Sequence, residues 1–391
     1  MTAIIKFEDI GVVYKDSYKK GIYNVNNKNF YYKIDALKEA DRSGAIINWD
    51  FHSGVFAEQA RKPRLNISMP ELYRLRAQQL RDKHNYLVLC YSGGADSDNI
   101  LEVFLRNNIK LDEILVEQSL KLFESIGFHP STNKDYSNWP SEWYLVVKPK
   151  LDQIAKLYPN IKITIIDNSL NPQEDDDEDT CRMGSVPTSY IAIRRHRLFD
   201  SVCESYQEKY KNAAVIVGCD KCVPSVKNGT FGFLITDFAA AFTTKDLVYF
   251  YWTPDMPEIV VEQAWCVWDY LHLYPKIAAE KFLSIRKNFI EYATNRDLHF
   301  DQIVKTITYP YWNINTFQAN KALGQLHHNA HWLIQNYQNE RWYQAWHSNF
   351  KSTLSSLSLD AFEKNNRKND YVRFTNYHAL GAFSSKGKNY D

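Results

Sequence analysis

The sequence has few cysteines, almost no net charge and no long apolar run. Six cysteines in 391 residues are too sparse for a disulfide scaffold, so reduced thiols are expected. Lys and Arg total 47 against 46 for Asp and Glu, so no overall field attracts nucleic acid or an anionic membrane. No window holds the ~20 consecutive apolar residues of a membrane helix, and charges interrupt the first apolar stretch, unlike in a signal peptide. We therefore expect a cytoplasmic protein without a membrane partner.

What the sequence does contain is an ordinary globular composition with many aromatic residues. A hydrophobic share of 45% and a charged share of 24% argue against a largely disordered chain. The 26 Tyr, 21 Phe and 10 Trp suit half-buried core positions and stacking surfaces alike, with core packing favoured. The length allows two domains, or one large domain with an extension.

Strand and helix patterns alternate through the middle of the chain. Apolar runs predict strands at 86–90, 113–118, 161–167 and 213–220, and helical spacing predicts helices at 99–108, 148–158 and 189–210. This alternation predicts an α/β fold with a doubly wound parallel sheet. Ligands bind such sheets at the carboxyl ends of the strands.

Four regions are expected along the chain. The first, 1–67, reads as a small α+β lead-in, with strands at 3–7 and 30–34 and a helix from Ala36 capped by Asp35. The second, 68–254, is the α/β domain, and it opens with a helix whose capping box pairs Ser68 with Glu71. A helical, aromatic-rich domain (255–364) and a polar tail (365–391) follow.

The most informative segment is SGGADS at 92–97, which follows the first central strand and precedes a helix. Two glycines let the backbone approach a polyphosphate, because no Cβ intervenes and positive φ is accessible. Amide groups of the turn and the helix dipole then favour an anion, and the hydroxyls of Ser92 and Ser97 add donors. Asp96 supplies a carboxylate for Mg²⁺. Neither a Walker loop with its lysine nor a G-x-G-x-x-G turn is present there.

This segment resembles the SGGxDS signature of the PP-loop ATP pyrophosphatase superfamily, and all six defining positions match. The resemblance implies a PP-loop (HUP-like, Rossmann-like) sheet that splits ATP into AMP and pyrophosphate. The loop would hold the pyrophosphate end of ATP, and the end of the second strand would contact the adenine. The ATP-binding residues expected on this basis are Ser92, Gly93, Gly94, Ala95, Asp96, Ser97, Val116, Gln118 and Gly218.

The fourth strand ends in GCDKC at 218–222. By the resemblance, Asp220 is a candidate to share Mg²⁺ with Asp96. Lys221 is a candidate to neutralise a phosphate, with an ordinary surface lysine as the alternative. The predicted catalytic residues are thus Asp96, Ser97 and Lys221, and the predicted metal ligands are Asp96 and Asp220.

Several other polar groups admit two interpretations. Cys219 and Cys222, with Cys181, could hold an iron–sulfur cluster or carry a persulfide, as in some tRNA-thiolating relatives, although merely reduced thiols are favoured. Arg194 and Arg197 share a helix face that could clamp a phosphate or form exposed ion pairs.

Two histidines and a group of tryptophans complete the ambiguous set. His327 and His331 have metal-ligand spacing, but a mixed surface and core role is favoured. The tryptophans of the C-terminal helices could stack nucleic-acid bases, but packing as a cap over the ATP site is favoured; they are Trp332, Trp342 and Trp346.

The predicted function is ATP-dependent adenylation of an acceptor, followed by amidation, amination or thiolation. The acceptor, a small molecule or nucleic acid, is not identified, and a partner protein could supply ammonia or sulfur. The overall arrangement resembles PP-loop proteins carried by bacteriophages, which suggests nucleotide or nucleic-acid modification. Two alternatives stay open: a sulfonucleotide-reductase-like enzyme, which needs a reactive cysteine, and a non-catalytic ATP-binding regulator.

Overall fold

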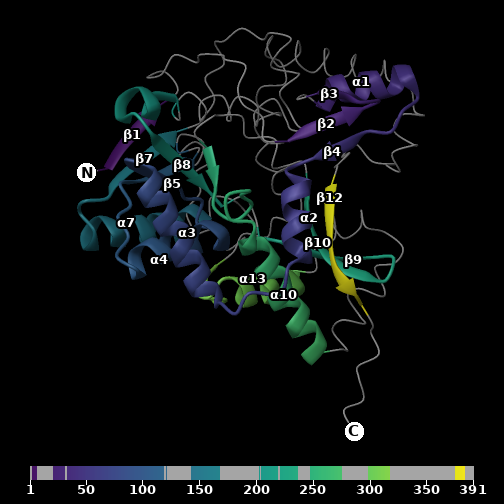
Figure 1. The fold of residues 1–391 in the computed structure, drawn as a ribbon. Helices are drawn as coiled ribbons and strands as arrows, with labels where there is room; N and C mark the ends of the chain where they lie inside the picture. Colours follow the sequence, from purple (N-terminus) through teal and green to yellow (C-terminus); the bar gives the residue numbers. More distant parts are fainter. Residues whose placement is uncertain are drawn as a thin grey trace, which may run out of the picture.

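Three sheets organise the chain in a computed structural model (Figure 1). The parallel sheet with its helices lies to the left in that view, and two small antiparallel sheets lie to the right. The structure describes residues 2–6, 21–30, 33–118, 120, 142–167, 202, 204–218, 221–236, 247–274, 298–317 and 375–383.

The largest sheet has six strands in the order β1-β7-β6-β5-β8-β11, and all five pairings are parallel. Its strands are β1 (Thr2–Lys6), β5 (Tyr86–Cys90), β6 (Glu113–Gln118), β7 (Lys162–Asp167), β8 (Ala213–Val217) and β11 (Leu247–Tyr249). All five residues of β8 are buried, as expected for a parallel strand covered on both faces.

The four predicted central strands are all present, and the prediction of a parallel α/β sheet is confirmed. Counted from β5 in chain order, β7-β6-β5-β8-β11 is the arrangement 3-2-1-4-5, which is compatible with a Rossmann-like fold. β11, which pairs with β8 at the other edge of the sheet, is a strand that the sequence pattern did not predict. β1 was predicted as part of the lead-in, but it pairs with β7 at the edge of this sheet.

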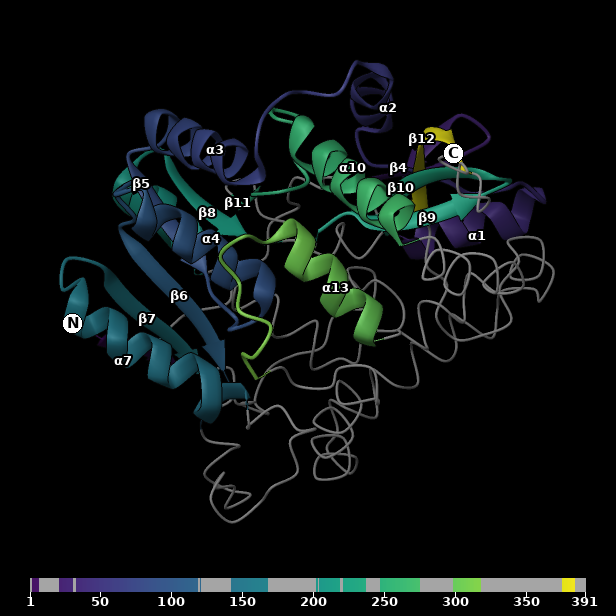
Figure 2. The same ribbon diagram turned by 90° about the horizontal axis from the view of Figure 1, so that it is seen from below.

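Three helices pack side by side against the sheet: α3 (Met69–Lys83), α4 (Ala95–Arg106) and α7 (Lys148–Leu157) (Figure 2). A π-helical segment, Trp143–Val147, leads into α7. The Nζ of Lys150 lies 2.6 Å from a carboxylate oxygen of Glu102, which joins α7 to α4. No helix in the described part of the chain has the length and apolarity needed to span a bilayer.

The start of α3 confirms the predicted cap. The hydroxyl of Ser68 accepts a hydrogen bond from the backbone N–H of Glu71 at 3.4 Å, and Pro70 lies in the first turn. The carboxylate of Glu71 is bound by the guanidinium of Arg74 at 2.7 Å. The local sequence signal therefore placed this helix correctly.

The two antiparallel sheets have the orders β3-β2-β4 and β12-β10-β9. Their elements and the helices beside them are β2 (Ile22–Val25), β3 (Lys28–Phe30), α1 (Lys33–Ser43), β4 (Asn48–Asp50), α2 (Ser53–Arg61), β9 (Val223–Lys227), β10 (Thr230–Thr236), α10 (Glu258–Leu273), α13 (Leu298–Thr308) and β12 (Thr375–Ala382). The side chain of Asn376 bonds the backbone N–H of Phe51 at 2.7 Å and the carbonyl of Trp49, which ties β12 to the segment beginning with β4.

Two sequence expectations differ from these elements. The helix expected from Ala36 begins at Lys33, so Asp35 lies inside α1 and is not its cap; the expected strand at 30–34 ends at Phe30. Part of the polar tail, Thr375–Ala382, forms a strand paired with β10. Pairing with β10 decides the second case, since the tail carries no strong local signal.

One hydrophobic core extends through most of the described chain. It contains Tyr73 of α3, Leu89 of β5, Ile259 of α10 and Tyr309 just after α13. Residues on both sides of position 254 therefore share a core cluster. The boundaries at 67, 254 and 364 stay predictions.

His378 of β12 is a buried histidine with an unfavourable environment for charge. Phe56, Phe233 and Trp252 surround its ring, and within the described residues its Nε2 has no hydrogen-bond partner. Burial lowers its pKa from 6.5 to about 4, while the charge of Asp50 opposes the shift. Between these two pKa values the unfolded chain binds more protons, so stability decreases as the pH falls below about 6.5.

We expect the free energy of unfolding to be lower at pH 5 than at pH 7 by about 2 kcal/mol on account of His378 alone. In a His378→Phe variant this difference should shrink by that amount, because no group titrates there. Urea unfolding at both pH values measures it, with the exposed His272→Phe as the control. An unchanged pH dependence in His378→Phe would show that His378 is not the titrating group.

Candidate functional site

The segment 92–97 lies at the switch point of the parallel sheet. β5, which precedes it, lies between β6 and β8 in the sheet. From β5 the strand order runs one way to β6 and β7 and the other way to β8 and β11, so it reverses at β5. At such a point the carboxyl ends of the strands border a crevice where ligands bind in open α/β folds. The sequence predicted a ligand site at strand ends, and the strand order places this segment at the expected one.

Gly93 has a conformation that other residues rarely adopt. Its φ is +78°, and a Cβ at this position would lie 2.5 Å from Cγ2 of Val147, in the π-helical segment. Both the dihedral angle and the close approach require glycine. The sequence argument for positive φ in this turn is confirmed at Gly93.

Hydrogen bonds among the two serines and Gly94 hold the turn closed. The Ser92 N–H donates to the Ser97 hydroxyl at 3.2 Å, which donates to the Gly94 carbonyl at 3.1 Å. The Gly94 N–H in turn reaches the Ser92 hydroxyl at 3.4 Å. Ser97 is buried, whereas Ser92 is exposed. In this structure, then, the Ser97 hydroxyl stabilises the loop, and Ser92 is the serine that solvent reaches.

The N-terminus of α4 has the features of an anion site. Gly94 is its N-cap, with extended φ and ψ of −73° and 160° and no side-chain cap. The first amides of any helix lack intrahelical acceptors, and the helix dipole adds positive potential there. Gly94 and Asp96 are half-exposed, so this end is accessible to solvent. A phosphate group is the kind of ligand that such a turn binds.

Asp96 and Gly218, both predicted from the sequence, lie against each other. A Cβ on Gly218 would come within 3.1 Å of the Asp96 Cβ, so only glycine leaves this approach unhindered. Tyr309 donates a hydrogen bond to Oδ1 of Asp96, and Tyr251 donates one to its backbone carbonyl at 2.8 Å. Neither tyrosine was predicted as a site residue.

A half-buried charged cluster supports the first turns of α4. Lys150 lies 3.6 Å from Asp98 and 2.6 Å from Glu102. Burial raises the pKa of Asp98, which also accepts a hydrogen bond from the Tyr91 hydroxyl at 3.2 Å. Burial by itself would lower the pKa of Lys150, but the two carboxylates raise it, so the lysine stays charged. The cluster locks α4 and α7 together beside the loop.

The two residues predicted at the end of the second strand have different surroundings. Val116 is fully buried, with 0% of its surface exposed. Gln118 is also buried, and no group in the described ranges donates a hydrogen bond to its Oε1. A buried amide oxygen without a donor is costly, so a ligand donor would stabilise it.

The remaining predicted residues are only partly described. Lys221 is 4% exposed, and its carbonyl accepts from the Trp252 indole at 3.4 Å; the structure does not test its catalytic role. Cys222 is fully buried, and its N–H donates to Gln263 at 2.9 Å. Predictions that lie outside the described residues concern Arg194, Arg197, Asp220, Cys181, Cys219, His327, His331, Trp332, Trp342 and Trp346. Across the described ranges, no three His, Cys, Asp or Glu side chains cluster as a metal site would require.

A cavity of about 460 Å³ lies elsewhere, beside the edge strand β11. Phe51 and Trp252 contribute aromatic walls, and Lys83, His84 and Asp255 contribute polar groups. None of its lining residues belongs to the 92–97 segment. The cavity and the loop are therefore separate features.

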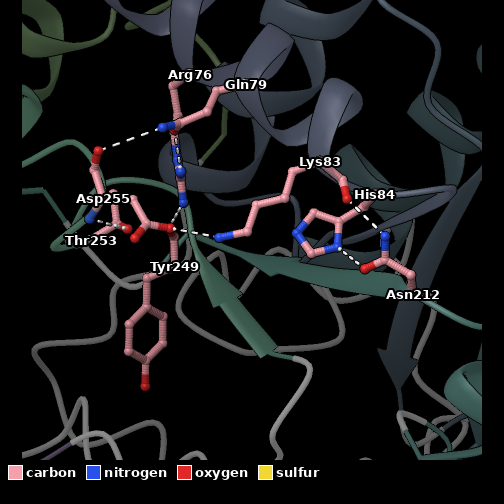
Figure 3. Close-up of polar contacts among 8 residues, drawn as sticks. All are labelled: Arg76, Gln79, Lys83, His84, Asn212, Tyr249, Thr253 and Asp255. Carbon is pink, nitrogen blue, oxygen red and sulfur yellow. Dashed lines mark hydrogen bonds and ion pairs between the residues drawn. The ribbon is translucent and has the colours of Figure 1, made fainter.

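Polar contacts organise one side of this cavity (Figure 3). Arg76, which is 1% exposed, donates to the Tyr249 carbonyl at 2.9 Å and to Gln79 at 2.6 Å. Burial lowers its pKa to about 10, so it stays charged at neutral pH. Lys83 pairs with Asp255 at 3.2 Å. These contacts join α3 to the end of β11 and to the segment that follows it.

A scan against protein-family models, a search of curated proteins and a search of solved structures each found no match to this chain. The fold defines the class: this is a mixed α/β protein with a parallel sheet whose strand order is compatible with a Rossmann-like fold.

Proposed function

We propose that this protein binds ATP at 92–97 and splits it between the α- and β-phosphates to adenylate an acceptor. One observation carries the proposal: a turn with a positive-φ glycine and an uncapped helix N-terminus lies at the switch point of a 3-2-1-4-5 sheet. Its sequence is that of the PP-loop signature. Sequence and geometry thus support the same ligand, a polyphosphate, through independent arguments.

The residues of the site suit separate parts of ATP. Amides of the turn and of the first turn of α4 would bind the pyrophosphate end, with the exposed Ser92 hydroxyl as an added donor. Gln118 would accept a hydrogen bond from the adenine amino group, which would satisfy its Oε1. Val116 is fully buried, so it would support the strand beneath the base without contacting the ligand.

Asp96 is the residue of the loop that suits Mg²⁺, since one or two carboxylates together with substrate phosphates are the usual magnesium site of nucleotide enzymes. Bound there, Mg²⁺ would neutralise charge growing on the pyrophosphate leaving group. An acceptor oxygen would attack the α-phosphorus, forming a P–O bond as the bond to pyrophosphate breaks. An amine, ammonia or sulfur nucleophile would then displace AMP from the adenylated acceptor.

The test is chromatography of α-labelled ATP incubated with the protein, Mg²⁺ and a cell extract. Labelled AMP with pyrophosphate above the extract alone is the expected result, and fractionation of the extract would then identify the acceptor. Formation of ADP would contradict cleavage between the α- and β-phosphates. ATP binding without any product from any fraction would favour a non-catalytic regulator.

Cys222 does not support the alternative of a reductase-like function. It needs a reactive cysteine, and reactive thiols lie in partly exposed, electropositive surroundings. Cys222 is fully buried. We expect Cys222→Ser to retain the AMP-forming reaction, since no thiol takes part in it.

A further inference from the structure

Two tyrosines from outside the loop hold Asp96 at different atoms. The hydroxyl of Tyr309 donates to the side-chain oxygen Oδ1, and the hydroxyl of Tyr251 donates to the backbone carbonyl at 2.8 Å. The rings of the two tyrosines contact each other, with centroids 5.2 Å apart. Both the carboxylate and the backbone of Asp96 are thus fixed from one side.

Tyr309 itself is rigidly placed. It directly follows α13, where its N–H donates to the Lys305 carbonyl at 2.8 Å, and its side chain is fully buried. The preceding carbonyl, that of Thr308, accepts a hydrogen bond from the Tyr73 hydroxyl at 2.6 Å. Gln263 of α10 donates to this same hydroxyl at 2.8 Å. Helices α3, α10 and α13 therefore set the position of the phenol.

Tyr251 is held in the same way. The amide of Asn99, one turn along α4, donates to its hydroxyl at 3.1 Å. The same hydroxyl donates to the Asp96 carbonyl, so one phenol joins the loop to the first turns of α4.

We propose that Tyr309 is a positioning residue that orients the Asp96 carboxylate for a divalent cation bound together with a nucleotide. The inference rests on the proposed function, because it assigns that cation to Asp96. A carboxylate has about four acceptor positions, so a hydrogen bond from one phenol is compatible with simultaneous cation binding. The hydrogen bond restricts the carboxylate to one rotamer, which lowers the entropic cost of binding the cation.

The test uses Tyr309→Phe, which removes one hydroxyl and keeps the ring. ATP binding to the full chain is measured by calorimetry over a series of Mg²⁺ concentrations and in EDTA. We expect the Mg²⁺ concentration for half-maximal enhancement of ATP binding to rise about five- to tenfold, the usual net effect of losing one typical hydrogen bond. ATP affinity in EDTA should not change. Tyr311→Phe, two residues further on, is the matched control and should behave as the original protein.

A second comparison separates positioning from packing. In an Asp96→Asn background, Tyr309→Phe should cause no further change in Mg²⁺ dependence, because the carboxylate through which it acts is gone. If Tyr309→Phe does not fold, Tyr251→Phe replaces it. Tyr251 contacts the Tyr309 ring and binds the Asp96 backbone carbonyl, so its substitution should shift the carboxylate and raise the Mg²⁺ concentration for half-maximal enhancement of ATP binding. An unchanged concentration would overturn the positioning role.

The outcomes distinguish this inference from the proposed function. A protein that does not bind ATP at any Mg²⁺ concentration overturns both. Mg²⁺-dependent ATP binding that is the same in the original protein and in Tyr309→Phe overturns only the positioning role, even if the variant unfolds at a lower temperature.

Discussion

Replacing Asp96 by Asn is expected to lower ATP-dependent AMP formation by at least about 10²–10³-fold, the usual loss when one charge-stabilising group is removed from an active site. The substitution preserves shape, and the Asn oxygen still accepts the hydrogen bond from Tyr309. Stability should fall by less than about 1 kcal/mol, the value of a carboxylate in the first turn of a helix. Labelled AMP formation and urea unfolding measure the two effects.

Asp152→Asn is the matched control for this variant. Asp152 lies on the neighbouring helix α7, is exposed, and pairs with Lys148 at 2.8 Å. Removing its charge should leave AMP formation unchanged, because surface ion pairs contribute little. Normal AMP formation by Asp96→Asn would exclude Asp96 from the reaction.

Replacing Gly93 by Ala is expected to be the most destabilising change in the loop. The positive φ of +78° would strain any residue with a Cβ, and the added carbon would overlap Val147 at 2.5 Å. Strain and overpacking together should lower the free energy of unfolding by about 2–5 kcal/mol. ATP binding should also weaken, because the amides of the turn would be displaced.

Variants at two other glycines separate the effect of backbone strain from that of overpacking. Gly229 has φ of +73° but no atom within 4 Å of an added Cβ, so Gly229→Ala should cost only the ~1–2 kcal/mol of strain. Gly54 in α2 has open space and no positive φ, so Gly54→Ala should stay within about 0.5 kcal/mol of the original protein. Urea unfolding of the three variants should rank them in this order. Equal losses for Gly93→Ala and Gly229→Ala would mean that the Val147 contact is unimportant.

Much of the parallel sheet was predictable because its signals are local. Buried parallel strands are continuous apolar runs, and β6 ends where its sequence pattern ends, at Gln118. The start of α3 was predictable for the same reason, since Ser68 bonds an amide three residues away. The loop was predictable because two consecutive glycines lie between a strand pattern and a helix pattern.

The missed elements depend on distant partners. β11 has three residues and acquires its role by pairing with β8. β12 has the sequence TNYHALGA, which lacks the apolar alternation typical of a strand, and its partner β10 lies far back in the chain. Lys150 of α7 contacts Asp98 and Glu102 of α4. No sequence spacing relates residues on two different helices, so this contact could not be predicted.

The sequence by itself determined the chemistry of the loop, the order of its strand, turn and helix, and the parallel sheet around it, because each depends on neighbours a few residues apart. Only the tertiary structure decided that Gly218 approaches Asp96 and that Tyr309, 213 residues further along the chain, donates to its carboxylate. Such contacts form where hydrophobic packing brings separate helices and strands together. Because the hydrophobic effect is non-directional, no spacing in the sequence indicates which distant residues will meet. The residues that we propose to bind a phosphate could thus be chosen from the sequence, whereas those that hold them in place could not.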